Sequence, residues 1–224
     1  MYSSTKFVLL FAIALVAGLT GVGVIGANLG GAFWIVCVVA MLSPVAATSS
    51  EGAASSLLVG VAASLGAAIA SVFLLMSDAF TFPQSLAVAV VALALGVLLA
   101  SIVRLLVLIR VLPVLAAGVV TLLALAWLSW PVWLSPWLTF PTSGDVATRL
   151  AAVHPLMSIN AVTQQFGFWT QGKVIYRLTT VGQNFQVGVP AGVMRCAIAH
   201  MGIAVILSAV VLLLRRRVPL QREG

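Results

Sequence analysis

Long apolar runs separated by short polar breaks make up most of the chain. The breaks hold glycine, proline, serine and a few charged residues, as at Gly26–Gly31 and Thr48–Ser55. A helix of about 20 apolar residues crosses the hydrocarbon core of a bilayer, because each residue rises about 1.5 Å. The pattern therefore predicts six membrane-spanning helices, at residues 7–25, 32–47, 56–76, 85–103, 114–130 and 196–214.

One break, residues 131–195, is much longer than the others and carries helix signals of its own. Asp145 fits the N-cap of a short helix, and Pro155 fits the first position of a second one that runs to Phe166 and ends before Gly167. We expect interfacial helices here. The predicted fold is an all-α, polytopic membrane bundle that forms a single domain.

The long break is also rich in tryptophan, which predicts an ordered segment. Disordered loops are polar and poor in aromatic residues, whereas burying an aromatic side chain contributes about 1.5–3 kcal/mol. We expect a lid over the outer ends of the spans, either an extracellular gate or a simple cap over apolar helix ends. The residues assigned to this outer gate are Trp133, Trp137, His154, Pro155, Phe166 and Trp169.

Composition and charge exclude a soluble protein and set an orientation. The chain is 62% hydrophobic and 7% charged, against about 25% charged residues in soluble domains. Its net charge of +7 comes from residues at the ends of apolar runs, such as Arg104, Arg110 and Arg215–Arg217. This pattern favours contact with anionic membrane lipids over nucleic acid. The positive-inside rule predicts cytoplasmic termini in a cell inner or plasma membrane.

Two short motifs have both a functional and a structural interpretation. Gly21–Gly26 matches the dinucleotide fingerprint GxGxxG, but it lies inside an apolar run without the required strand and acidic residue. We interpret it, like the spacing of Gly26 and Gly30, as close helix packing through small residues. Cys196 and His200 share a helix face, yet a metal site needs three or four ligands. We expect His200 to hydrogen-bond a neighbouring helix.

No catalytic pattern or cofactor motif is found. The acidic residues are Glu51, Asp78, Asp145 and Glu223, and all lie in breaks or in the C-terminal tail. Paired carboxylates, a nucleophile elbow and a Walker A sequence are missing, and no acid lies at the centre of a span to relay protons. We therefore expect no enzyme activity, no cofactor and no metal, and two free cysteine thiols.

The arrangement resembles the membrane subunit of ABC exporters of the type-2 class. Six spans, an acidic-glycine pair (Glu51-Gly52) in the loop after the second span, and His154-Pro155-Leu156 before the last span carry the likeness. The resemblance implies a permease-like subunit that dimerises and docks a separate cytoplasmic ATPase at Glu51 and Gly52. The alternative is a non-transporting accessory subunit of a larger membrane complex. The apolar interior favours that alternative or a lipid-like substrate.

Overall fold

The computed structural model describes residues 2–49, 53–76, 80–133, 149–150, 152–162 and 192–217. The secondary structure of these residues is entirely helical, as predicted. The helices are α1 (Tyr2–Ile25), α2 (Leu29–Thr48), α3 (Ala53–Ala70) with its 3-10 continuation η1 (Ser71–Met76), α4 (Phe82–Leu108), α5 (Pro113–Trp133), α7 (Pro155–Val162) and α9 (Val193–Arg217).

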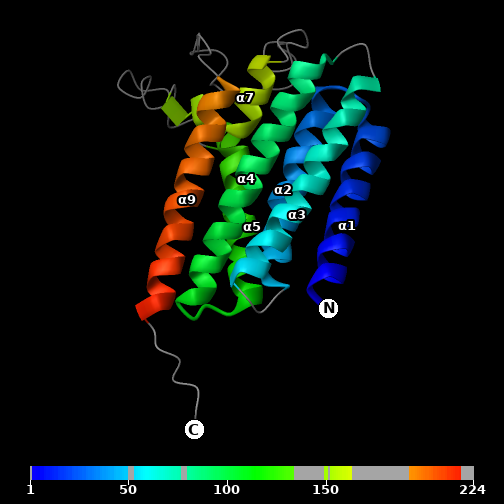
Figure 1. Ribbon diagram of the computed structural model, residues 1–224. Coiled ribbons are helices and arrows are strands. Elements are labelled where there is room, and N and C mark those ends of the chain that lie inside the picture. Colours follow the sequence, from blue (N-terminus) through cyan, green and yellow to red (C-terminus); the bar gives the residue numbers. More distant parts are fainter. Residues whose placement is uncertain are drawn as a thin grey trace.

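Six of these helices are long and apolar enough to cross a membrane, which confirms the predicted fold class. Figure 1 shows them side by side, with the start of α1 and the end of α9 at one end of the bundle and α7 at the other. These ends are called the termini end and the α7 end. The spans are Thr5–Ile25, Gly30–Thr48, Leu58–Met76, Phe82–Leu108, Pro113–Trp130 and Val193–Leu214.

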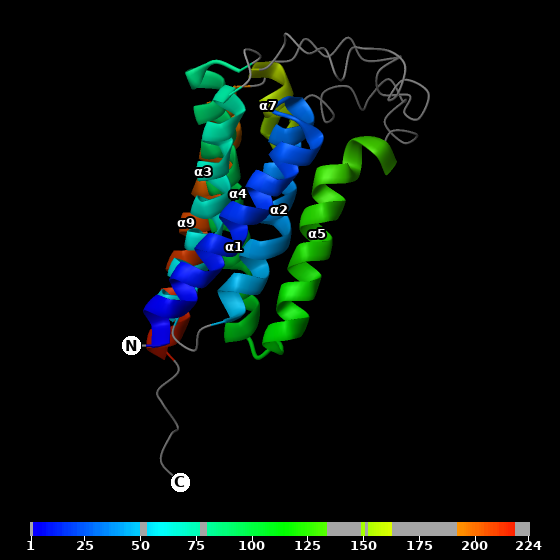
Figure 2. The ribbon, with the colours of Figure 1, turned by 90° about the vertical axis from the view of Figure 1, so that its right-hand side faces the viewer.

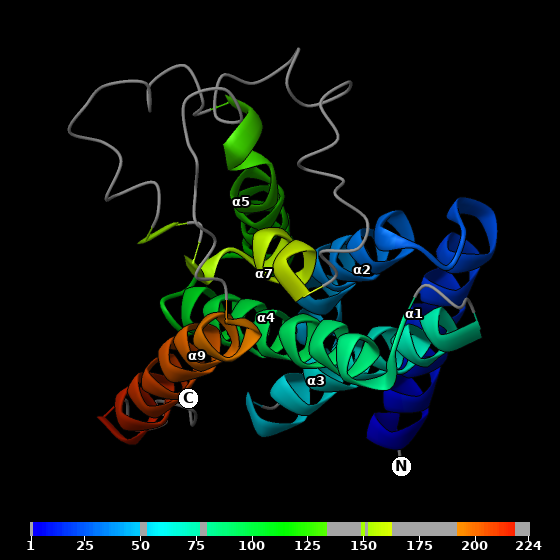
Figure 3. The ribbon, with the colours of Figure 1, turned by 90° about the horizontal axis from the view of Figure 1, so that it is seen from above.

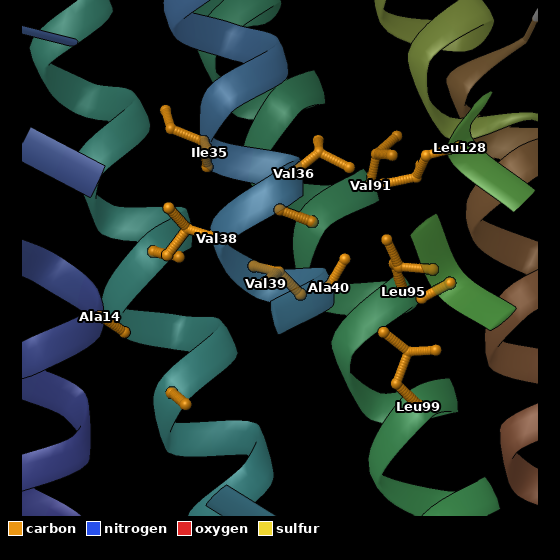
Figure 4. Close-up of a cluster of buried hydrophobic side chains, with 14 of the residues drawn as sticks. Ala14, Ile35, Val36, Val38, Val39, Ala40, Val91, Leu95, Leu99 and Leu128 are labelled. Carbon is orange, nitrogen blue, oxygen red and sulfur yellow. The ribbon is translucent and has the colours of Figure 1, made fainter. Parts of the chain in front are cut away.

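Helix α2 forms the centre of the bundle and packs against α1, α3, α4 and α5. Its side chains meet those of the other helices in a continuous apolar core (Figure 4). The outward faces of the peripheral helices are apolar as well, and Val24 and Val114 are each 83% exposed. Such a surface suits lipid. The labelled core residues are Ala14, Ile35, Val36, Val38, Val39, Ala40, Val91, Leu95, Leu99 and Leu128.

Small residues let the helices approach closely. A Cβ atom on Gly66 of α3 would collide with the backbone carbonyl of Phe11 in α1. One on Gly60 would lie 2.7 Å from the Cβ of Ala100 in α4. The interpretation of the first glycine motif is only partly correct. Gly21 lies against the Trp34 ring, but Gly23 faces open space.

Two helix ends differ from the predicted ones for local reasons. Helix α2 begins at Leu29, since Asn28 caps it by accepting a hydrogen bond from the Gly31 N–H at 3.2 Å. Gly26 forms the turn before it with a φ of 102°. Helix α4 continues to Leu108, so Arg104 lies within the span with its side chain buried. One long arginine side chain near a helix end does not terminate a span.

Candidate functional site at the α7 end of the bundle

The short helix α7 is inserted between the outer parts of α2, α4 and α9. Viewed from the α7 end, it lies beside α4, between α5 and α9 (Figure 3). Pro155 occupies its first position, as predicted, where the missing N–H costs nothing. Leu156 and Ile159 point into the bundle and are buried. The helix is therefore part of the packed core at this end of the bundle.

His154 precedes α7 and joins it to α5. Its Nε2 lies 3.0 Å from the Trp127 carbonyl oxygen, and the Met157 N–H donates to its Nδ1 at 3.2 Å. A carbonyl only accepts and a backbone N–H only donates, so the ring is the neutral tautomer with its proton on Nε2. Through Nδ1 the histidine acts as an N-cap of α7.

The surroundings of His154 keep its ring uncharged. The side chain is fully buried, and this loss of hydration lowers its pKa to about 4, against an opposing effect of hydrogen bonds to the Trp127 and Leu128 backbone. The ring centroid lies 5.3 Å from that of Trp127 and 5.8 Å from that of Trp130. Trp130 is buried against this histidine.

The other end of α7 is fixed by Gln84 at the start of α4. Its Nε2 donates to the carbonyl of Val162, the last residue of α7, at 3.1 Å. Its Oε1 accepts from the Thr81 N–H at 2.8 Å. This role of Gln84 was not predicted, although Thr81-x-x-Gln84 has the spacing of a capping box. Helix α7 is thus hydrogen-bonded to α5 at its start and to α4 at its end.

Cys196 and His200 connect α9 to the same region. The Cys196 thiol donates to the Val153 carbonyl at 3.2 Å. The Nδ1 of His200 lies 2.8 Å from the carbonyl oxygen of Cys196, one turn earlier in α9. The expectation that His200 bonds a neighbouring helix is therefore wrong for the described residues. No group of three or more possible metal ligands occurs in the described part of the chain.

A lateral cavity of about 280 Å³ lies below α7, between α4, α5 and α9. Helices α5 and α9 each pack against α4 but stand apart from each other (Figures 2 and 3). The lining is apolar except for Trp127 and His200, and the cavity faces the gap between α5 and α9, which do not pack extensively against each other. The lining residues are Leu95, Leu98, Leu99, Ile102, Val120, Leu123, Ala124, Trp127, Val153, Ala199, His200 and Ile203.

The structure places only part of the predicted site. His154 and Pro155 lie together at the α7 end. Trp133 is the last residue of α5, and its side chain is not among those that the structure describes. Glu51, Gly52, Trp137, Phe166 and Trp169 lie outside the described residues. Comparison with protein families, curated proteins and solved structures gives no match to this chain.

Proposed function

We propose that the chain is a permease-like subunit of an exporter that works with a separate cytoplasmic ATPase and handles a lipid-like substrate. The lateral cavity between α4, α5 and α9 carries this proposal. An apolar molecule enters such a cavity directly from the bilayer and needs no polar pore. The close contacts of α1, α2, α3 and α4 through small residues agree with a lateral route.

The proposed transport cycle uses α7 as the outer closure. Helix α7 bridges α5, α4 and α9, so its release from His154 or Gln84 would free the outer ends of these helices. Rocking of α5 and α9 relative to α4 would then change the access to the cavity. In this proposal both termini are cytoplasmic and two copies assemble, so that each contributes a cavity. The chain itself performs no chemical step.

The proposed ATPase contact lies at the termini end, in the loop that contains Glu51. Helix α2 ends just before this loop, and the Lys6 ammonium donates to the Ser49 carbonyl there at 2.7 Å. This bond satisfies an orphan carbonyl and places a positive charge at the negative end of the helix dipole. The start of α1 is thereby held beside the proposed docking loop.

Co-purification tests the proposal. We expect Glu51→Ala to abolish recovery of the ATPase with the membrane protein, without changing its abundance in the membrane. Asp78→Ala is the matched control, since the proposed topology places this acid on the opposite side. Recovery of equal ATPase with Glu51→Ala and the unsubstituted chain would contradict the contact.

The alternative is an accessory subunit that packs within a larger membrane complex. The observation that favours it is the extent of apolar helix surface, for example the exposed Val114 and Leu122 of α5, which could pack against other subunits. Mild solubilisation separates the two functions. A stable complex without any ATPase, unaffected by Glu51→Ala, is the result that identifies an accessory subunit.

A further inference from the structure

The lateral cavity is lined by two polar side chains, Trp127 and His200, and of these His200 offers an acceptor, its Nε2. The Cys196 carbonyl can only accept, so Nδ1 of His200 carries the proton in that bond. In the neutral ring Nε2 is then an acceptor, and it makes no hydrogen bond within the described part of the chain. His200 is 6% exposed and lines the cavity.

The position of His200 within the cavity follows from the pairing of α4 and α9. Both helices run from the α7 end to the termini end, and Ser101 contacts Ser208 at 3.2 Å. His200 lies about two turns before Ser208. It is therefore level with the Leu95 end of the cavity, the end nearer α7, while Ile102 and Val120 line the deeper part.

We propose that this cavity binds a neutral lipid whose single hydroxyl group donates a hydrogen bond to Nε2 of His200. An acceptor that faces an apolar cavity without a partner gains from a hydrogen bond, so a hydroxyl donor is the group that complements it. A charged headgroup is disfavoured, because the described lining offers no opposite charge to offset its desolvation. The apolar part of the molecule lies along Leu99, Ile102 and Val120.

A second cavity on the other side of α4 provides an internal comparison. It has a volume of about 250 Å³, lies between α3, η1 and α4, and is also apolar and lateral. Its two serines, Ser71 and Ser85, satisfy each other, because each hydroxyl donates to the backbone carbonyl of the other residue. Both serines are buried, so their hydroxyl oxygens offer little accessible acceptor surface to this second cavity. We therefore expect it to take any lipid chain of suitable size.

This inference deepens the proposed function by naming the substrate class, and its test needs no ATPase. The purified full-length chain in lipid nanodiscs is labelled with a photoreactive hexadecanol that carries a diazirine in its alkyl chain. The matched probe is the methyl ether of the same alcohol, which accepts hydrogen bonds but cannot donate one. Mass spectrometry locates the labelled residues, and competition by each unlabelled compound gives its relative affinity.

We expect the alcohol to bind the His200 cavity about three- to tenfold more tightly than the ether, the range for one net hydrogen bond. The second cavity, near Ser71 and Ser85, should show equal affinities. His200→Leu should abolish the preference, and His200→Gln should retain it, because the glutamine carboxamide oxygen is an acceptor. Ala199→Phe should remove labelling by both probes from the His200 cavity alone.

Equal affinities in the unsubstituted chain, or a preference that survives His200→Leu, would overturn the inference. Persistent labelling of the cavity in Ala199→Phe would overturn its location. If His200→Gln retains the preference for the alcohol, the loss of that preference in His200→Leu is not caused by misfolding that any substitution of His200 would produce. If Glu51→Ala leaves ATPase recovery unchanged while the alcohol preference holds, the exporter proposal fails and the lipid site stands.

Discussion

At the scale of single residues, His154 shows what a sequence does not reveal about a candidate site. Its neighbour Pro155 could be placed at the start of a helix, because the proline ring fixes φ and lacks an N–H. The burial of His154, its tautomer and its bond to Trp127 depend on how α5 and α7 meet in space. Those contacts link residues far apart in the chain, and local patterns do not determine them.

Acidification should destabilise the α7 end through His154. Its folded-state pKa of about 4 lies below the usual 6.5, so the unfolded chain takes up the proton first. The stabilisation is present above about pH 6.5 and is lost as the pH falls towards 4, by up to about 3 kcal/mol. Thermal unfolding of the detergent-solubilised chain should show a falling midpoint between about pH 7 and pH 5.

His154→Gln supplies the control for this pH dependence, because glutamine does not titrate in this range. At neutral pH the variant should be less stable than the unsubstituted chain. On acidification its stability should fall less than that of the unsubstituted chain. His200 is the titratable side chain that acts electrostatically on His154. The variant His200→Gln therefore shows how much of the pH dependence comes from His200. An unchanged pH profile in His154→Gln would exclude this histidine as the cause.

At the scale of helices, hydropathy located all six spans and several of their ends, but not the start of α2 or the end of α4. The predicted start at Ala32 was late, because the capping role of Asn28 was not recognised. The predicted end at Val103 was early, because Arg104 was taken as a boundary. Helix α4 instead ends in a Schellman turn, in which Arg110 has a φ of 72° and the Val111 N–H donates to the Leu106 carbonyl at 3.0 Å.

Glycine at position 110 should strengthen this turn. A non-glycine residue in the left-handed region costs about 1–2 kcal/mol, so Arg110→Gly removes that strain together with the charge. Arg110→Ala removes the charge and keeps the strain. We expect Arg110→Gly to unfold at a higher temperature than Arg110→Ala in the same detergent. Equal midpoints for the two variants would show that the turn relaxes without cost.

Close contact between α1 and α3 makes a second prediction at this scale. Gly66→Ala would place a methyl group against the Phe11 carbonyl and 3.2 Å from the Leu15 nitrogen. Backbone atoms cannot rotate away, so we expect a loss of about 1–3 kcal/mol in stability. The control is Gly202→Ala in α9, where a Cβ meets no atom within 4 Å. The two midpoints in thermal unfolding should differ clearly, with Gly202→Ala near the unsubstituted chain.

At the scale of the whole molecule, the two ends of the bundle should face different sides of the membrane. The turn around Ala27 lies at the α7 end, and the turn around Leu112 lies at the termini end. In a background where Cys37 and Cys196 are replaced, we expect Ala27→Cys to react with an impermeant maleimide in intact cells. Leu112→Cys should react only after permeabilisation. The reverse pattern would invert the proposed topology.

The pairing of helices also bears on biogenesis. Helix α1 packs more extensively against α3 than against α2, and α9 packs chiefly against α4. Because synthesis proceeds from the N-terminus, α1 cannot reach its packed position until the third span has been synthesised. Helix α9, which forms one wall of the lateral cavity, is synthesised after the helices that form the other walls. Until α9 has been synthesised, this side of the cavity is open, so a lipid bound there as proposed would be acquired only after α9 is in place and would not be trapped earlier during insertion.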